Sequence, residues 1–153
     1  MEVKELGHLV LYVRNLQRSA AFYRDVLGWR QVAGPGTGDL PFPAAAFSSG
    51  RTHHELLLIE VGEDAASVPS GRRVGLYHFG LKVGDTDEEL RDALRRLQEA
   101  GVELVGASDH TVTHSLYIRD PDGNEIELYV DVPGVDWMAR PELIASPIRP
   151  LRL

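Results

Sequence analysis

The sequence contains no cysteine, which excludes a disulfide framework, a thiol nucleophile and a cysteine-rich zinc site. No apolar run approaches the roughly 20 residues of a membrane-spanning helix, so no membrane partner is expected. Basic residues are in deficit, with 16 Lys and Arg against 23 Asp and Glu, and the net charge of -7 argues against nucleic acid as a partner. The first residues lack the apolar segment of a signal peptide, and a cytoplasmic location is expected.

Hydrophobic periodicity indicates the order of elements in the first half of the chain, whose 153 residues suit one domain. Asn15 can act as the N-cap of a helix whose apolar residues share one face and which ends at Gly28. Glycine and proline concentrate in residues 34–43, which we expect to form a loop. Runs typical of strands lie at residues 6–13, 29–33, 44–49 and 54–61.

The second half repeats this order after a polar segment without periodicity, residues 62–74, which we interpret as a linker. Three signals indicate a helix here. Residues 85–87 can cap its start, and Gly101 can end it. Between them, Leu90, Leu94 and Leu97 form an apolar stripe on one helical face. Strands are predicted around this helix at residues 77–83, 102–105, 113–119 and 125–130.

An internal repeat therefore organises the chain. His8 and His78 each begin the pattern His-x-x-x-x-Val in the first strand of their half. One half alone has an open sheet that cannot bury both faces, whereas two halves side by side can close their sheets into a cup. We predict an α+β fold, a single domain over residues 1–153 in which two paired βαβββ modules, about 5–61 and 75–131, form a cup-shaped mixed sheet around a metal site. The tail, residues 132–153, lies outside the repeat, and the sequence leaves open whether it packs over the cup or against a partner subunit.

Three residues are candidates for holding the metal ion. A single histidine in a strand is more often a hydrogen-bonded structural residue than a ligand, but His8 and His78 occupy equivalent places in the repeat. Glu127 shares a strand face with residues 125 and 129, and a glutamate facing the interior needs a partner or a metal. If that face is solvated instead, Glu127 is an ordinary surface acid. Two imidazoles and one carboxylate form the facial triad that suits Fe(II) or a similar divalent ion.

These residues resemble the vicinal oxygen chelate superfamily, which includes glyoxalase I, the fosfomycin- and bleomycin-resistance proteins and type I extradiol dioxygenases. The resemblance spans about residues 5–131 and is carried by His8 in GHLVLYV, residues 21–28 (AFYRDVLG), His78 in YHFGLKV, and Asp-Pro-Asp-Gly-Asn at 120–124 followed by Glu127. It implies that the metal is held by His8, His78 and Glu127, with Fe(II) as the expected ion and Mn(II), Ni(II) or Zn(II) as alternatives.

The catechol 2,3-dioxygenase-like branch resembles the chain most in detail. Asp109-His110, five residues, Leu116-Tyr117 and then the Asp-Pro-Asp-Gly turn are similar to the signature of that branch, and so is the pair His53-His54. The resemblance implies that His54 is the acid–base group and that His110 and Tyr117 hydrogen-bond the bound oxygens. Its implied substrates are a catechol-type aromatic molecule and O2, and its implied product is a ring-opened semialdehyde acid. We also expect a homodimer.

Two other functions stay open. A glyoxalase-like lyase or an epimerase would use Glu55 as a further metal ligand, since Glu55-Leu56-Leu57 parallels Glu127-Leu128-Tyr129. Neighbouring strand residues point to opposite faces, so His54 and Glu55 do not both enter the cup unless a bulge intervenes. We expect His54 to face the cup and Glu55 to face away. The other alternative is a drug-binding resistance protein without catalysis.

Overall fold

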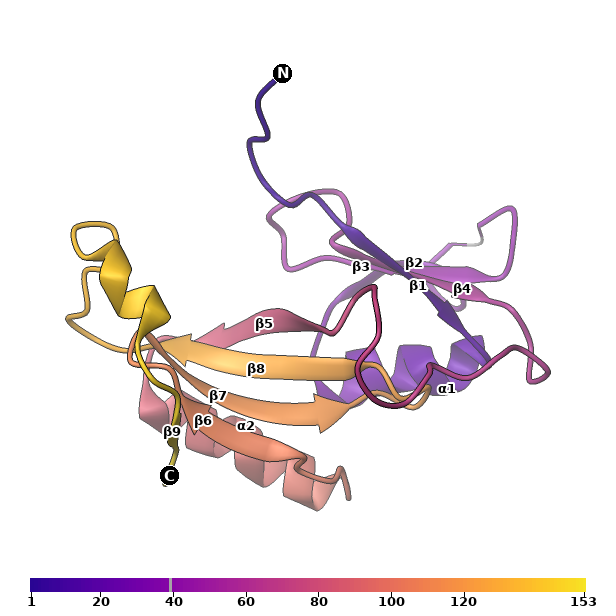
Figure 1. Cartoon of the computed structure of the whole chain (residues 1–153). Coiled ribbons are helices and arrows are strands. Elements are labelled where there is room, and N and C mark those ends of the chain that lie inside the picture. Colours follow the sequence, from indigo (N-terminus) through magenta and orange to yellow (C-terminus); the bar gives the residue numbers. More distant parts are fainter. Residues whose placement is uncertain (39) are drawn as a thin grey trace. The chain divides into compact units, whose positions relative to one another are not determined.

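The computed structural model describes residues 1–38 and 40–153, so one residue of the predicted loop 34–43 lies outside the described part. The chain divides into two compact units, Met1–Val68 (unit 1) and Pro69–Leu153 (unit 2). The boundary between them falls inside the segment 62–74 that the sequence marks as a linker. Each unit has its own sheet and its own helix (Figure 1).

Unit 1 is a βαβββ module. Its elements are β1 (Leu9–Val13), α1 (Leu16–Ala21), the π-helical turn η1 (Phe22–Val26), β2 (Gln31–Ala33), β3 (Ala44–Phe47) and β4 (Leu56–Glu60). The strand order is β1-β4-β3-β2, in which β1 and β4 are parallel and the other neighbours antiparallel. Helix α1 packs against β3 and β4.

The alternation of side chains in unit 1 explains which face of its sheet is covered. In β1, Leu11 and Val13 are buried while Val10 and Tyr12 are exposed. Asn15 caps α1 as predicted, because its side chain accepts a 2.9 Å hydrogen bond from the backbone of Arg18. The apolar face of the helix, the buried β1 side chains and the aromatic residues of the unit form one core.

The predicted single helix of unit 1 changes its winding after Ala21. The Leu27 amide bonds the Phe22 carbonyl, five residues back, at 3.1 Å, so the second half of the helix is a π turn. Gly28 then ends the helix in the left-handed conformation, with a φ of 73°, as the sequence predicts. The π turn is only five residues long and ends the helix, so no later helical residues follow it to reveal the changed winding in the sequence pattern.

Unit 2 repeats the module and adds a strand from the tail. Its elements are β5 (His78–Gly84), α2 (Asp87–Glu99), β6 (Gly106–Asp109), β7 (Thr113–Arg119), β8 (Glu125–Asp131), the 3-10 helix η2 (Pro141–Ala145) and β9 (Arg149–Pro150). The order β5-β8-β7-β6 matches that of unit 1, and β9 pairs with the outer edge of β6. The predicted α+β class and the two βαβββ modules are confirmed.

Helix α2 covers one face of the unit 2 sheet (Figure 1). Its Leu90 and Leu97 are buried against the strands, and Thr86 caps it by accepting a hydrogen bond from the Glu89 backbone. Glu89 in turn accepts from the Asp85 backbone at 2.8 Å, so the two side chains form a capping box. The opposite face of the sheet is left to polar side chains, and this face positions the candidate site.

One predicted strand is wrong. Residues 102–105 do not form a strand, and β6 begins at Gly106. Gly101, with a φ of 68°, turns the chain out of α2, and the Val102 amide bonds the Leu97 carbonyl at 2.8 Å to complete the helix end. The apolar residues of this segment therefore follow the helix cap, and the ladder with β7 starts only when the Val105 amide reaches Tyr117.

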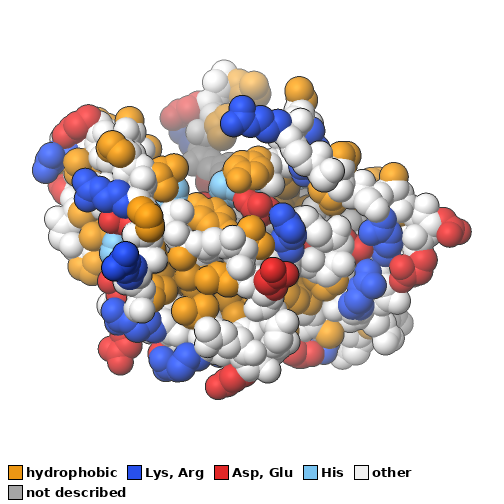
Figure 2. Space-filling model, turned by 60° about the horizontal axis from the view of Figure 1, so that its bottom comes forward, with side chains coloured by type: hydrophobic (Ala, Val, Ile, Leu, Met, Phe, Trp, Pro, Cys, Tyr) orange, Lys and Arg blue, Asp and Glu red, His pale blue; other side chains and the backbone are white. Residues whose placement is uncertain are grey.

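The tail, residues 132–153, belongs to unit 2. Its β9 pairs Ser108 with Pro150 and Asp109 with Arg149, so it extends the sheet edge next to β6. Figure 2 shows hydrophobic side chains between acidic and basic ones on one face of the molecule. The described tail has five exposed large apolar residues of its own, Trp137, Met138, Ile144, Ile148 and Leu153. Within residues 1–38 and 40–153, no helix is long and apolar enough to cross a membrane.

Candidate functional site

The polar face of the unit 2 sheet gathers four of the predicted site residues. In β8 the residues Ile126, Leu128 and Val130 are buried toward α2, so Glu125 and Glu127 lie on the other face. β5 runs parallel beside β8 with His78 opposite Glu125, and β7 runs antiparallel with Tyr117 opposite Glu127.

The turn between β7 and β8 fixes this register. The carboxylate of Asp120 accepts hydrogen bonds from the backbone of Asp122 and Asn124, at 3.0 and 2.8 Å, and from the Asn124 side chain at 2.9 Å. Gly123 adopts a φ of 91°, which only glycine takes without strain. The Asp-Pro-Asp-Gly-Asn motif is therefore a rigid turn, and its effect on the site is to hold Tyr117 against Glu127.

Short contacts connect the four residues. The Nε2 atom of His78 lies 3.2 Å from the Oε2 atom of Glu127, and the Tyr117 hydroxyl donates to the Oε1 atom of Glu127 at 3.2 Å. His110 Nε2 lies 2.7 Å from the same hydroxyl. The His78 and Glu127 side chains are only 27% and 17% exposed, so the carboxylate is largely removed from water. The structure thus brings His78, Glu127, His110 and Tyr117 together.

The electrostatics of the cluster keep its phenol protonated. Burial is the main cause that raises the pKa of Tyr117 to about 12, and the charge of Glu127 and the hydrogen bond to it act in the same direction. Tyr117 is therefore a hydrogen-bond donor throughout the neutral range.

The donor set of unit 2 fits a divalent metal ion. Ligand atoms that share one ion at the usual bond lengths lie about 3 Å apart, close to the separation of His78 and Glu127. The Nδ1 atom of His78 is buried and has no hydrogen-bond partner among the described residues, whereas a metal-binding imidazole usually donates a hydrogen bond from its second nitrogen. Taken singly, neither unit gathers three His, Asp or Glu side chains in a metal-binding arrangement within its described residues. Unit 2 therefore offers two of the three predicted ligands.

Unit 1 contains the third predicted ligand, His8, next to a second predicted residue. The rings of His8 and His54 are 4.7 Å apart between centroids, and the Nδ1 atoms of His53 and His54 lie at 2.6 Å. Burial is the main cause that lowers the pKa of His54, with the charges of His53 and His8 acting in the same direction. His54 is therefore neutral at pH 7 and able to accept a proton.

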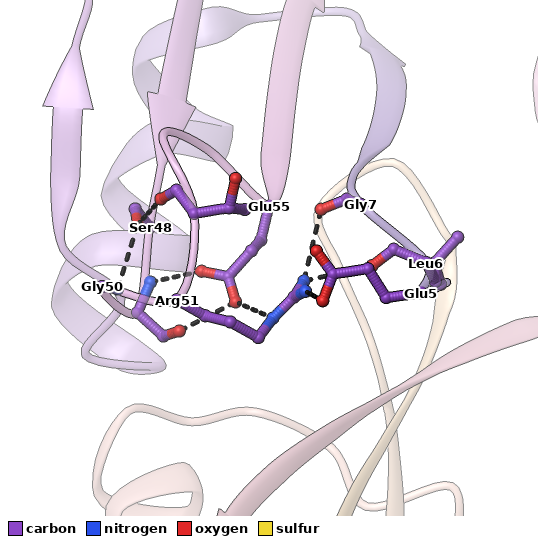
Figure 3. A network of polar contacts seen from close by, with 9 residues as sticks. Glu5, Leu6, Gly7, Ser48, Gly50, Arg51 and Glu55 are labelled. Carbon is purple, nitrogen blue, oxygen red and sulfur yellow. Dashed lines mark hydrogen bonds and ion pairs between the residues drawn. The ribbon is translucent and has the colours of Figure 1, made fainter. Parts of the chain in front are cut away.

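The Glu55 side chain is engaged in a local network of polar contacts (Figure 3). It accepts hydrogen bonds from the backbone and the hydroxyl of Ser49, at 2.5 and 2.8 Å, and from Arg51 Nε at 3.0 Å. Burial alone would raise the pKa of Glu55, but the hydrogen bonds from Ser49 and Arg51 outweigh burial and lower the pKa below its usual value. The Glu55 carboxylate is therefore the hydrogen-bonded counter-ion of Arg51.

Arg51 extends this network to the segment before β1. Its guanidinium pairs with Glu5 at 2.9 Å and donates to the backbone carbonyls of Leu6 and Gly7, at 3.1 and 3.2 Å (Figure 3). The residue next in the chain is His8. The network thus anchors the backbone from which the His8 side chain extends.

Strand register corrects the parallel drawn between Glu55 and Glu127. β1 and β4 pair Leu9 with Leu56, and the Leu9 amide bonds the Glu55 carbonyl at 2.8 Å, so Glu55 lies beside His8. The counterpart of that place in unit 2 is Glu125, which lies opposite His78. The counterpart of Glu127, which lies opposite Gly80, is Leu57, which lies opposite Val10. Unit 1 therefore has no acid where unit 2 has its predicted ligand.

Sequence analysis missed the place of Glu125, although a signal exists. Glu125 follows His78 by the same number of residues as Glu55 follows His8.

His114 lies on the helix side of β7, away from the candidate site. Its Nδ1 atom is 2.6 Å from Asp87 of α2, and its Nε2 atom is 3.7 Å from Asp109. His114 is a structural residue that fixes the start of α2.

The fold agrees with three comparisons. Residues 5–128 match the family model of the Glyoxalase/Bleomycin resistance protein/Dioxygenase superfamily. The chain is 36% identical over 136 residues to catechol-2,3-dioxygenase of Bacillus subtilis (strain 168), covering 89% of this chain and 45% of the relative. It is 34% identical over 129 residues to biphenyl-2,3-diol 1,2-dioxygenase 3 of Rhodococcus globerulus, and this match covers 82% of this chain and 63% of the relative. A crystal structure of lactoylglutathione lyase from Agrobacterium tumefaciens superposes with a TM-score of 0.62 at 27% identity. The superposition covers 85% of this chain and 96% of the lyase chain.

The chain belongs to the Glyoxalase/Bleomycin resistance protein/Dioxygenase superfamily. Its relatives include a catechol dioxygenase, a biphenyl-diol dioxygenase and a lyase, so membership defines the scaffold and not one reaction. The chain spans about half to two thirds of the length of the two dioxygenases it matches.

Proposed function

We propose that the chain is an extradiol dioxygenase, which binds one Fe(II) ion through His8, His78 and Glu127 and cleaves a catechol-type ring with O2. The observation that carries the proposal is the contrast at the edge of unit 1. His54 lies against His8, whereas Glu55 is engaged by Ser49 and Arg51. A lyase that used Glu55 as a further ligand would first have to break that network.

The other half of the proposed site supports the same reaction class. Two histidines and one carboxylate leave coordination positions open for a bidentate substrate and O2. When bound, Fe(II) supplies Lewis acidity and a place where the two substrates meet. The register equivalent of Glu127 in unit 1 is the apolar Leu57, so no second carboxylate comes from that position.

The side chains of the chain have distinct proposed tasks. His54, neutral at pH 7, accepts a hydroxyl proton when the diol binds and returns it later in the reaction. Tyr117, whose phenol stays protonated, donates a hydrogen bond toward the substrate oxygens, and His110 holds its hydroxyl at 2.7 Å. Cleavage of the carbon–carbon bond beside the two hydroxyls, with both atoms of O2 incorporated, gives a semialdehyde acid. A homodimer, a cytoplasmic location and the choice of iron over Mn(II), Ni(II) or Zn(II) stay predictions.

The test combines metal analysis with turnover. Protein purified without added metal is analysed for bound ions, loaded anaerobically with Fe(II), and mixed with a panel of catechols under O2 while oxygen uptake and the semialdehyde chromophore are followed. His78→Ala is expected to lose both metal and turnover, because two ligands hold a labile divalent ion poorly. His114→Ala removes a histidine on the other face of β7 and is expected to keep the metal.

Two results would overturn the proposal. One is full metal content in His78→Ala. The other is a loaded wild-type protein that leaves every catechol intact yet converts a glutathione thiohemiacetal or an epimerisable acyl substrate, which would assign the chain to the lyases.

A further inference from the structure

Glu125 is a largely buried carboxylate to which the proposed reaction gives no task. Its side chain is 16% exposed, and its Oε1 atom lies 3.6 Å from the Nδ1 atom of His78. That nitrogen is buried and has no hydrogen-bond partner in residues 1–38 or 40–153. Partly buried carboxylates are costly without a partner, so the position of Glu125 calls for an explanation.

The two nitrogens of the His78 ring face two different carboxylates. Nε2 is the nearer to Glu127, at 3.2 Å, and Nδ1 is the nearer to Glu125. An imidazole that gives one nitrogen to a metal carries its proton on the other, and that N–H group is usually held by a carboxylate, a carbonyl or water. A separation of 3.6 Å is longer than a hydrogen bond, and a small rotation of either side chain would close it.

A second neighbour holds the Glu125 carboxylate in place. The Tyr77 phenol lies beside it and is hydrogen-bonded to it. Strand pairing supplies the remaining constraint, because Glu125 is opposite His78 in β5 and opposite Arg119 in β7. Glu125 is thus fixed next to His78 by the sheet and by a neighbouring side chain.

We propose that Glu125 is the positioning residue of the metal site, which accepts the Nδ1–H of His78 and so directs Nε2 toward the ion beside Glu127. This inference rests on the proposed metal site and adds to it the residue that selects the tautomer of one ligand. Glu125 is not itself a ligand of that ion, because it faces the opposite nitrogen of the ring. Unit 1 has no such arrangement, since its counterpart Glu55 is engaged by Arg51.

The experiment replaces Glu125 in two ways and measures metal binding without turnover. Glu125→Leu removes the acceptor, whereas Glu125→Gln keeps an amide oxygen and removes only the charge. Glu103→Gln, an exposed carboxylate of the same unit, controls for the loss of one negative charge. Zn(II) affinity is measured by competition with a chromophoric chelator, and circular dichroism shows that each variant is folded.

We expect Glu125→Leu to lower the affinity 10- to 100-fold, the range known for lost outer-shell partners, and Glu125→Gln to lower it less. Glu103→Gln should be unchanged. Long-range proton–nitrogen NMR spectra of the zinc-loaded wild-type protein should show the His78 proton on Nδ1. The His78 signals are assigned by their disappearance in His78→Ala.

The outcomes separate this inference from the proposed function. If His78→Ala loses the metal while Glu125→Leu binds it within twofold of wild type, the role of Glu125 is refuted and the metal site stands. A His78 proton on Nε2 refutes the role as well, and Glu125→Gln permits this measurement if the leucine variant does not fold. If His78→Ala keeps its metal, the proposed function itself fails.

Discussion

The two units share a strand order and place their equivalent histidines in opposite chemical surroundings. His78 of unit 2 lies between two carboxylates, Glu125 and Glu127. His8 of unit 1 lies beside the neutral His54, and the acid nearest to it in the sheet, Glu55, is engaged by Arg51. Repetition of the module has therefore preserved the backbone, whereas the acid–base character of the two halves has diverged.

This divergence suits a site that needs only one carboxylate. Three ligands with a single negative charge leave room for an anionic diol, whereas a second carboxylate from unit 1 would occupy a position and add negative charge. The position that could supply it holds Leu57. In the proposed function, unit 1 contributes instead the proton carrier His54 and an anchored backbone before His8. The predictions below test this division of tasks.

The largest expected difference lies between the acids of the two units. Glu127→Ala should abolish metal binding and turnover, because it removes a ligand. Glu55→Ala should keep the full metal content, because Glu55 is hydrogen-bonded to Ser49 and Arg51. Metal content per folded chain, measured on both variants side by side, checks the pair. An equal loss of metal in the two variants would show that both units contribute a carboxylate to metal binding.

Removal of the proton carrier of unit 1 should have the next largest effect. His54→Phe should keep its metal, since His54 is not a proposed ligand, and should slow ring cleavage by roughly 10²- to 10⁴-fold, as for a lost acid–base group. Steady-state rates at saturating catechol, with metal content measured on the same sample, check this. A variant that loses its metal instead would make His54 a ligand.

A smaller effect on turnover is expected from removal of the Tyr117 hydroxyl of unit 2. Tyr117→Phe removes the hydroxyl that donates to Glu127 in the structure and that is proposed to turn toward the substrate when it binds. It leaves the proposed proton carrier His54 intact. We expect a loss in kcat of about fivefold, corresponding to one hydrogen bond of about 1 kcal/mol. His54→Phe measured under identical conditions is the reference. A larger loss in Tyr117→Phe than in His54→Phe would reverse the proposed roles.

The sequence predicts the scaffold well because its signals are local and repeated. The His-x-x-x-x-Val pattern, the capping residues before α2 and the alternation in β8 each fix one element, and the strand order follows from their repetition. Asp120 and Gly123 reveal the turn through residue types that only such a turn requires. From these signals the sequence predicts that His78, Glu127, His110 and Tyr117 meet.

Features that depend on pairing across strands escape the sequence. Glu55-Leu56-Leu57 and Glu127-Leu128-Tyr129 look alike as letters, but hydrogen-bond register matches Glu55 with Glu125. The engagement of Glu55 by Arg51 depends on the conformation of a turn and on a contact 46 residues away, from Arg51 to Glu5. The place of Glu125 beside His78 likewise exists only once β5 and β8 are aligned.

The smallest expected effect concerns stability in acid and comes from the same Glu55 network. The pKa of Glu55 is lowered in the folded protein, so its stabilising contribution is present above its unfolded pKa, near 4.5, and is lost as the pH falls through the folded value. Glu55→Gln should therefore be less stable than wild type at pH 7, and the difference should shrink below about pH 4.

The size of the difference follows from exposure. Arg51 is 43% exposed and Glu55 13%, so solvent screens the pair and its contribution should stay below about 1 kcal/mol. Urea unfolding at pH 7 and at pH 3.5 measures it, with Glu103→Gln as the control for an exposed carboxylate. A Glu55→Gln variant equally destabilised at both pH values would mean that the amide disturbs packing, and that the charge of Glu55 does not hold Arg51 against the segment before His8.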